Sequence, residues 1–123
     1  MSTLIWIDDH LAGVTLRKPI LENCGYSVLT ARTAQEGLAL LSAAPVDGVI
    51  LDYRLPDMDG ETLVRHIRAL DSTLPIVVLS RSCDTTPDAI ADRANAAFTK
   101  AQDSFAAVIT KVTELIIERK QKA

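Results

Sequence analysis

Acidic, hydroxyl and amino side chains follow several short apolar runs of this sequence, each at the point where a run ends. Asp8 and Asp9 follow the first run, Asp52 the third, Ser80 the fourth and Lys100 the fifth. If the runs are parallel strands of one sheet, these side chains meet at its carboxyl edge, where α/β sheets bind ligands. Two carboxylates about 5 Å apart repel by roughly 3 kcal/mol at an effective dielectric near 20, and Lys100 neutralises only one charge of three. A divalent cation relieves this repulsion, and hard oxygen ligands with retained water predict Mg²⁺.

Helix capping is the alternative explanation for each acid taken singly. Asp9 precedes a predicted helix, a position that favours aspartate. Asp52 precedes the turn formers Pro56 and Gly60. Capping does not explain why acids, a hydroxyl and an ammonium group follow four different strands at one predicted edge. The combined pattern therefore favours a site for a metal and an anion.

The apolar runs alternate with amphipathic stretches, which is typical of a parallel sheet covered by helices on both faces. The runs are short, partly β-branched and bounded by Asp, Gly and Pro, as buried parallel strands are. The predicted strands are Thr3–Ile7, Tyr26–Ala31, Gly48–Leu51, Pro75–Leu79 and Ala96–Thr99. The predicted helices are Leu11–Asn23, Ala34–Ala43, Glu61–Leu70, a short helix from Thr86 to about Ala94, and a last helix capped by Asp103 or Ser104.

Several local signals concern helix ends and turns. Thr33 followed by Glu36 is a capping-box pattern that opens the second helix. Pro19 removes a backbone N–H inside the first helix and is expected to kink or shorten it. Asp57 and Asp59 are predicted to be turn and helix-cap acids.

Length and composition indicate one globular domain over residues 1–123. The net charge of −3 gives no basic field for nucleic acid. No apolar stretch is long enough to span a bilayer, and the N-terminus lacks the basic region of a signal peptide. Cys24 and Cys83 match no metal-binding spacing and suit a reducing compartment. We therefore expect a cytoplasmic protein that binds neither nucleic acid nor a membrane.

The sequence resembles the receiver domain of two-component response regulators over essentially its whole length. The resemblance depends on the pair Asp8 and Asp9, the segment LDYRLPDMDG at 51–60, Ser80 after PIVVL, and Lys100 after Thr99. It implies a doubly wound, five-stranded parallel sheet of flavodoxin-like strand order 2-1-3-4-5, flanked by five helices. It also implies a phosphorylated signalling switch of a phosphorelay rather than a classical enzyme.

The resemblance implies a role for each acid. Asp52 is the expected phosphoacceptor, and the expected donor is the phosphohistidine of a sensor histidine kinase or of a histidine phosphotransfer protein. Asp9, Asp52 and the backbone carbonyl of Arg54 are expected to bind Mg²⁺ directly. Asp8 is expected to act mostly through metal-bound water.

The resemblance also implies how the phosphoryl group is held and read. Ser80 and Lys100 are expected to bind its oxygens, and a lysine with a metal offsets the charge of a transferring phosphoryl group. A downstream protein is expected to dock on the helix–strand–helix face between Thr86 and Glu118, and the same face is a candidate surface for a homodimer.

Three positions depart from the usual pattern of the family. Arg81 stands where a small residue usually follows the hydroxyl, so a long cation either gates the pocket, contacts phosphate or faces solvent. Ala97 replaces the usual switch tyrosine or phenylalanine, and Phe98 is expected on the opposite face because side chains alternate along a strand. Ala101 replaces the usual proline after Lys100, and a cis bond before a non-proline residue costs about 3 kcal/mol. We therefore expect trans geometry or a strained exception there, and an altered relay from the phosphorylation site.

Other interpretations remain open at this point. In one interpretation the chain is a pseudo-receiver that acts only through protein contacts. In another it is the receiver fragment of a hybrid histidine kinase. The intact set of acids disfavours the pseudo-receiver, whereas the three departures favour it. A phosphohydrolase of the haloacid dehalogenase type needs a second acid two residues after its nucleophile, and Asp8 is followed there by His10.

Overall fold

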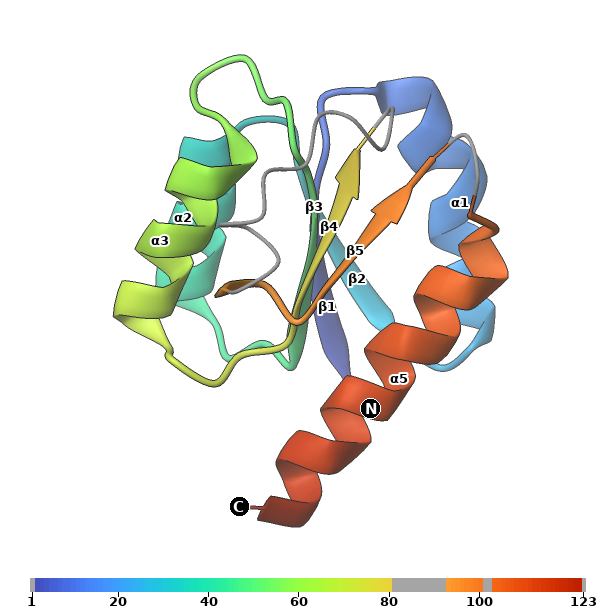
Figure 1. The fold of residues 1–123 in the computed structure, drawn as a ribbon. Coiled ribbons are helices and arrows are strands. Elements are labelled where there is room, and N and C mark those ends of the chain that lie inside the picture. The colour runs from blue at the N-terminus through green and yellow to red at the C-terminus, as the bar shows by residue number, and fades with distance from the viewer. Residues whose placement is uncertain (1, 81–92, 101–102, 123) are drawn as a thin grey trace.

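The computed structural model describes residues 2–80, 93–100 and 103–122 (Figure 1). Five strands form one parallel sheet in the order β2-β1-β3-β4-β5, as predicted. The strands are β1 (Thr3–Ile7), β2 (Ser27–Ala31), β3 (Gly48–Asp52), β4 (Ile76–Ser80) and β5 (Ala96–Thr99). The described helices are α1 (Leu11–Asn23), α2 (Ala34–Ala43), α3 (Gly60–Leu70) and α5 (Phe105–Lys122). The helix predicted from Thr86 to about Ala94 lies almost wholly outside the described residues.

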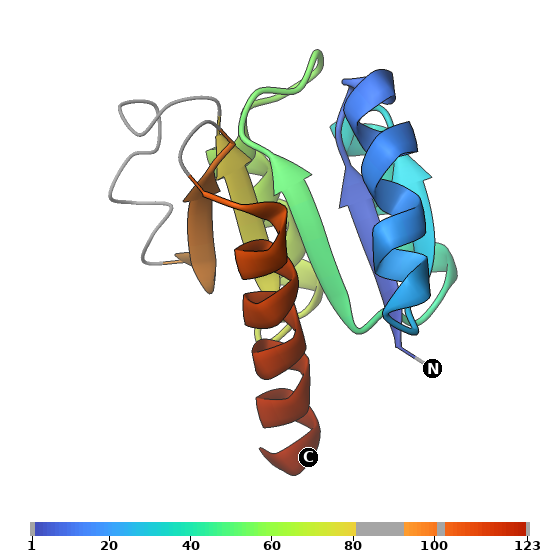
Figure 2. The same ribbon diagram turned by 90° about the vertical axis from the view of Figure 1, so that its right-hand side faces the viewer.

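Helices cover both faces of the sheet, with α2 and α3 on one side and α1 and α5 on the other (Figure 1, Figure 2). In β1, Ile5 and Ile7 pack on the α2–α3 side, whereas Leu4 and Trp6 pack on the α1–α5 side. Successive side chains of a strand point to opposite faces, so β1 contributes side chains to the hydrophobic cores on both faces of the sheet. None of the helices in the described ranges is long and apolar enough to cross a membrane.

Several element ends differ from prediction by one residue. β3 and β4 end one residue later, at Asp52 and Ser80, and α3 begins one residue earlier, at Gly60. α1 has the predicted bounds and runs through Pro19, so of the two effects expected of the proline, a kink or a shortening, the shortening does not occur. The helix is followed by Gly25, whose φ of 94° favours glycine. The Tyr26 N–H donates to the Leu21 carbonyl at 3.2 Å, so this residue closes the helix end and β2 begins one residue later. Pro75 has no N–H to give to a sheet, and β4 likewise begins one residue later.

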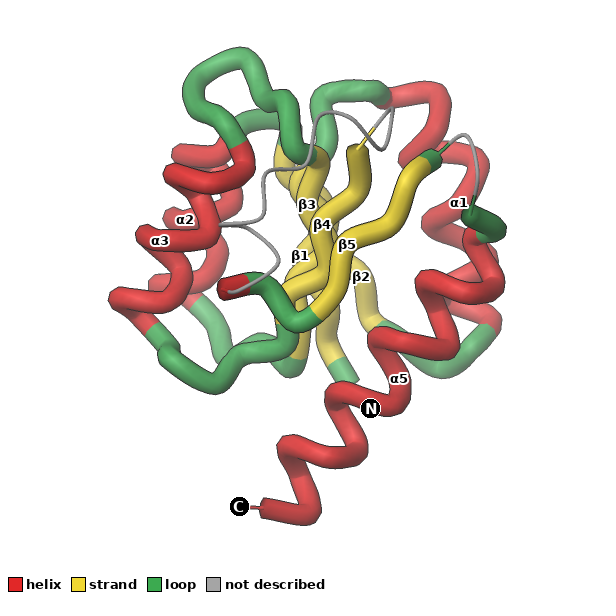
Figure 3. The backbone as a smooth tube through the Cα atoms, viewed as in Figure 1, coloured by secondary structure: helices red, strands yellow, loops and turns green. Residues whose placement is uncertain are grey.

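The carboxyl ends of the strands lie at one edge of the sheet, and the loops after β1 and β3 begin there (Figure 3). β1 pairs with β2 on one side and with β3 on the other. The winding direction therefore reverses between β1 and β3, and the ends of these two strands are the expected binding position of the fold.

Gly37 allows α2 to pack closely against β1. A Cβ atom at this position would overlap Ile7 Cδ1 and lie 2.7 Å from Ile7 Cγ1. Overpacking of a core costs about 1–3 kcal/mol, so we expect Gly37→Ala to lower the free energy of unfolding by about 1 kcal/mol or more in urea denaturation.

Gly13→Ala is the matched control for this exchange, because it is the same change in another helix. A Cβ atom at Gly13 would have Arg17 Nη1 as its nearest neighbour, at 3.5 Å. We expect a gain of about 0.5–1 kcal/mol there from helix propensity. Equal effects at the two glycines would contradict the packing argument.

Candidate functional site

The register of the sheet brings the acids of β1 and β3 together. Ile7 lies opposite Leu51, so the residues that follow them, Asp8 and Asp52, lie side by side at the carboxyl edge. Both are buried, with exposed fractions of 4% and 2%, whereas Asp9 is exposed. One carboxylate oxygen from each of the three acids lies within 4.8 Å of the others. The fold thus gathers the acids that the sequence pattern grouped.

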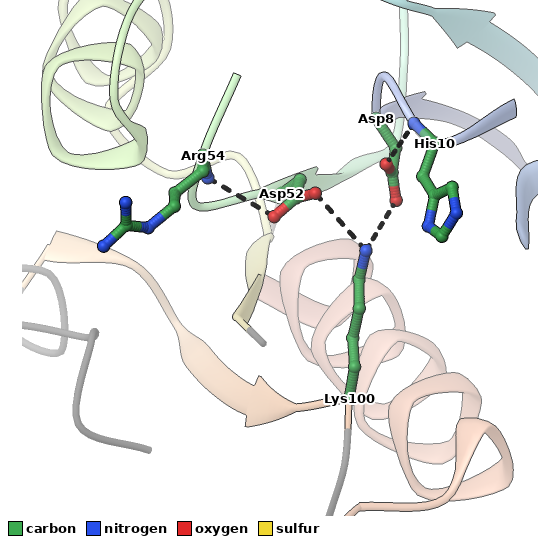
Figure 4. A network of polar contacts seen from close by, with 5 residues as sticks. All are labelled: Asp8, His10, Asp52, Arg54 and Lys100. Carbon is green, nitrogen blue, oxygen red and sulfur yellow. Dashed lines mark hydrogen bonds and ion pairs between the residues drawn. The ribbon is translucent and has the colours of Figure 1, made fainter. Parts of the chain in front are cut away.

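Lys100 reaches this cluster from the edge strand. Thr99, the last residue of β5, pairs with Ser80 of β4, and the Lys100 N–H donates to the Ser80 carbonyl at 2.7 Å. The side-chain Nζ lies 3.0 Å from Asp8 Oδ2 and 3.3 Å from Asp52 Oδ2 (Figure 4). Ser80 itself is buried at the end of its strand. One cation therefore bridges two buried carboxylates, and the cluster keeps an excess of negative charge.

Backbone groups complete the contacts of the two buried acids. Asp8 Oδ1 accepts from the His10 N–H at 2.9 Å, and Asp52 Oδ1 accepts from the Arg54 N–H at 3.3 Å (Figure 4). Burial raises the pKa of Asp52; Lys100 opposes this rise, the charge of Asp8 adds to it, and the Arg54 N–H opposes it. On balance the pKa of Asp52 is raised, because burial and the charge of Asp8 outweigh the single cation Lys100. A divalent cation supplies further positive charge.

A short loop after β3 lies beside the acids and carries Arg54. The Tyr53 N–H donates to the β4 backbone at 2.8 Å, and the Gly60 N–H donates to the Tyr53 carbonyl at 2.6 Å. Glycine is required at position 60 because a Cβ atom would lie 2.9 Å from Tyr53 Cα. Asp59 caps α3 by accepting from the Thr62 N–H at 2.8 Å, as predicted. Both ends of the loop are therefore fixed, and the Arg54 side chain is exposed.

Comparison with known proteins identifies the family. The sequence model of the response regulator receiver domain matches residues 4–112. The chain belongs to this family.

Relatives of this receiver domain are longer proteins. The chain is 36% identical over 88 residues to the transcriptional regulatory protein GlrR of Escherichia coli, with 72% of this chain and 20% of GlrR covered. It is 33% identical over 87 residues to the sensory/regulatory protein RpfC of Xanthomonas campestris, with 68% and 12% covered. The chain thus spans about a fifth or less of the length of these two proteins.

Solved receiver-domain structures share the fold over nearly the whole chain. A CheY-like receiver domain of Methanospirillum hungatei is 26% identical, with a TM-score of 0.90 and coverage of 100% of this chain and 99% of that one. The response regulator TrrA of Thermotoga maritima, solved in complex with Mg(2+)-BeF, is 26% identical, with a TM-score of 0.85 and coverage of 94% and 99%.

The donor set of this receiver domain fits Mg²⁺. Three carboxylate oxygens within 4.8 Å of one another are hard ligands at a spacing that one ion can bridge. Asp9 is the exposed member, so water retained by the metal has room on its side. The observed contacts of Lys100 leave the third carboxylate without a cation among the described ion pairs.

Two of the three departures from the family pattern, Arg81 and Ala101, lie outside the described residues, and so does the geometry of the bond between Lys100 and Ala101. Ala97 is described and is exposed on β5. Phe98 packs against the α1–α5 core, as strand alternation predicts. No aromatic ring therefore stands at position 97 of this receiver domain.

Sequence reasoning missed two sets of contacts around the site, one to Asp8 and one made by Asp57. The His10 backbone, not its side chain, contacts Asp8. Asp57, predicted as a turn or cap acid, bonds to α2 rather than to its own helix. The contacts of Asp57 join segments 22 and 23 residues apart, so no local pattern signals them.

Proposed function

We propose that this receiver domain accepts a phosphoryl group on Asp52, with Mg²⁺ bound beside it. The supporting observation is the cluster of three carboxylates, with Lys100 Nζ in contact with Asp8 and Asp52. Such a cluster is unfavourable without a further cation. It combines a carboxylate nucleophile, a set of metal ligands and a lysine, which are the parts that phosphoryl transfer to a carboxylate needs.

Each acid has a separate task in this proposal. Asp9, Asp52 and the Arg54 backbone carbonyl would hold Mg²⁺ directly, and Asp8 would hold it through water. The metal supplies positive charge to the oxygens of the transferring group. The fixed ends of the loop after β3 keep the Arg54 carbonyl near Asp52.

In the transfer step the nucleophile is one oxygen of the Asp52 carboxylate. A carboxylate oxygen of Asp52 attacks the phosphorus of a phosphohistidine; the new O–P bond forms, the P–N bond breaks, and the imidazole nitrogen keeps the electron pair. Lys100 Nζ and the hydroxyl of the buried Ser80 would bind the phosphoryl oxygens, in a site where electrostatic contacts are strong because water is scarce. The donor would be a sensor histidine kinase or a histidine phosphotransfer protein.

The new charge is the signal. The phosphoryl group carries about −1.5 to −2 charge in place of the single negative charge of the Asp52 carboxylate, so the net charge at this position becomes more negative. That change would draw Lys100 away from Asp8 and bias a surface that docks a downstream protein. That surface is the face between Thr86 and Glu118, which a second copy would also use as a homodimer. The relay from the phosphorylation site to this surface would not depend on an aromatic side chain at position 97. It would depend instead on the residues that depart from the family pattern, Arg81, Ala97 and Ala101. The protein would act in the cytoplasm as a switch rather than a classical enzyme, without direct contact with nucleic acid.

A second candidate is the receiver segment of a hybrid histidine kinase. It is favoured by the similarity to RpfC and by a 36% identity over 74 residues to the sensor histidine kinase RcsC of Salmonella typhimurium. The chain spans 12% of the first and 8% of the second. In that case a histidine phosphotransfer protein would exchange phosphoryl groups with Asp52.

Incubation with Mg²⁺ and acetyl phosphate tests the proposal. We expect the intact mass to rise by one phosphoryl group in the wild type, and not in Asp52→Asn or after EDTA. The same measurement with a phosphorylated histidine phosphotransfer protein as the donor tests the partner class. Sedimentation with and without beryllofluoride tests the homodimer.

Two results would decide against the proposal. A wild type that neither gains mass nor binds beryllofluoride is a pseudo-receiver. An Asp52→Asn variant that still gains mass places the phosphoacceptor elsewhere.

A further inference from the structure

We infer that Asp57 is a positioning residue for the metal side of the site, an inference that rests on the proposed function. Asp57 lies in the loop after β3, but its carboxylate bonds to a different element. Oδ1 accepts from the Ala34 N–H and Oδ2 from the Gln35 N–H, both at 2.9 Å. Those are the first two residues of α2.

The contact completes the N-terminus of α2. The first N–H groups of a helix have no partner within the helix. Thr33 Oγ1 accepts from the Glu36 N–H at 3.1 Å, and Asp57 accepts from Ala34 and Gln35 before it. A carboxylate is also favourable at this end of the helix dipole. Burial raises the pKa of Asp57, but the bonds from Ala34 and Gln35 outweigh it and the pKa is lowered. The contact is therefore made by the ionised acid.

The same contact closes a ring of hydrogen bonds around the acidic cluster. The Asp8 N–H donates to the Ala31 carbonyl at 2.9 Å, which joins the end of β1 to the end of β2. α2 begins three residues after Ala31, and Asp57 joins its first turn to the loop after β3. That loop follows Asp52 directly and carries Arg54. The ring thus connects the two strands that supply the metal ligands.

A cavity beside the acids shows what the ring holds in place. Asp9, Thr33 and Pro56 line a space of about 490 Å³ between the loops after β1, β2 and β3. Pro56 immediately precedes Asp57, so the bonds from Asp57 to α2 fix the third wall of this space. Without them the segment that carries Pro56 keeps only the attachments at the two ends of the loop. We therefore expect the Arg54 carbonyl, two residues before Pro56, to be held less firmly relative to Asp9.

Mg²⁺ affinity separates this role from simple helix capping. Displacement of Mn²⁺ by Mg²⁺, followed by the EPR signal of free Mn²⁺, gives the Kd. We expect Asp57→Ala to weaken Mg²⁺ binding roughly tenfold, the lower end of the effect of removing groups that support metal ligands. Asp57→Asn is as neutral as Asp57→Ala but keeps one acceptor oxygen, so we expect a smaller loss of affinity. Thr33→Ala removes the other cap of α2 and leaves the two hydrogen bonds between α2 and the loop in place, so we expect its Kd to stay within about twofold of the wild type.

Three results would overturn the inference. Asp57→Ala could bind Mg²⁺ as tightly as the wild type, Thr33→Ala could weaken binding equally, or Asp57→Asn could match Asp57→Ala, which would assign the effect to charge alone. If Asp57→Ala does not fold, the comparison of Asp57→Asn with Thr33→Ala decides by the same criterion. A wild type that binds no Mg²⁺ refutes the proposed function instead, so the two failures are distinguishable.

Discussion

Lys100→Met is expected to separate metal binding from phosphorylation, with opposite effects on the two. Lys100 contacts both buried acids, at 3.0 and 3.3 Å. Methionine keeps the length of the side chain and removes its charge, so Mg²⁺ no longer competes with an ammonium group for Asp8 and Asp52. We expect Mg²⁺ to bind about tenfold more tightly, which corresponds to about 1.4 kcal/mol.

Phosphorylation of the same variant is expected to be slower, because the oxygens of the transferring group lose a cationic donor. Removal of one such donor costs about 10²–10³ in rate. The rate of mass gain with acetyl phosphate and the Kd for Mg²⁺ by calorimetry measure the two effects. The metal-free variant should also be less stable, by about 3 kcal/mol, because two buried charges lose their partner.

Lys111→Met, the same exchange within α5, serves as the control. It should leave the phosphorylation rate and the Kd near those of the wild type. A Lys100→Met variant that is phosphorylated at the wild-type rate would show that the lysine does not contact the transferring group. Weaker Mg²⁺ binding would instead show that Lys100 helps to organise the acids.

The strands and most helix bounds could be predicted because each follows from a local pattern. β3 and β4 are buried along their length, so they appear as unbroken apolar runs that end at polar residues. For the last helix, sequence predicts an N-cap at either of two residues, Asp103 or Ser104. Ser104 Oγ accepts from the Ala107 N–H at 3.2 Å and so caps α5, whereas Asp103 accepts from the Thr99 N–H at 2.8 Å. Both residues fit a cap by type, and the choice depends on the path of the chain before the helix.

Sequence did not predict the contacts between the loop after β3 and the N-terminus of α2. A capping box was predicted at Thr33 and Glu36, and the Glu36 N–H does donate to Thr33. The Glu36 carboxylate, however, accepts from the Arg32 N–H at 3.3 Å rather than from Thr33. The remaining donors of α2 go to Asp57, which is 23 residues from Ala34. An acid in a turn has several uses, and only the packing of the loop against α2 decides among them.

Asp52→Asn is expected to stabilise the metal-free domain at neutral pH although it abolishes phosphorylation. Burial raises the pKa of Asp52, Lys100 opposes the rise, and Asp8 adds to it. A raised pKa means that the folded protein binds this proton more tightly than the unfolded chain does. The ionised acid therefore lowers stability as pH rises through the folded pKa. We expect the Tm of Asp52→Asn at pH 7 to exceed that of the wild type by a few degrees.

The pH dependence of that gain tests its cause. Thermal unfolding in EDTA should show the advantage of Asp52→Asn shrinking as pH falls through the pKa of Asp52, because the protonated acid is then as neutral as asparagine. Asp59→Asn is the control of opposite sign: hydrogen bonds from Thr62 lower the pKa of Asp59, so its contribution is present at neutral pH and lost in acid. Saturating Mg²⁺ should raise the Tm of the wild type more than that of Asp52→Asn. If Asp52→Asn is less stable than the wild type in EDTA at neutral pH, the contact between Lys100 and Asp52 outweighs burial and repulsion, and the acids need no metal to lie together.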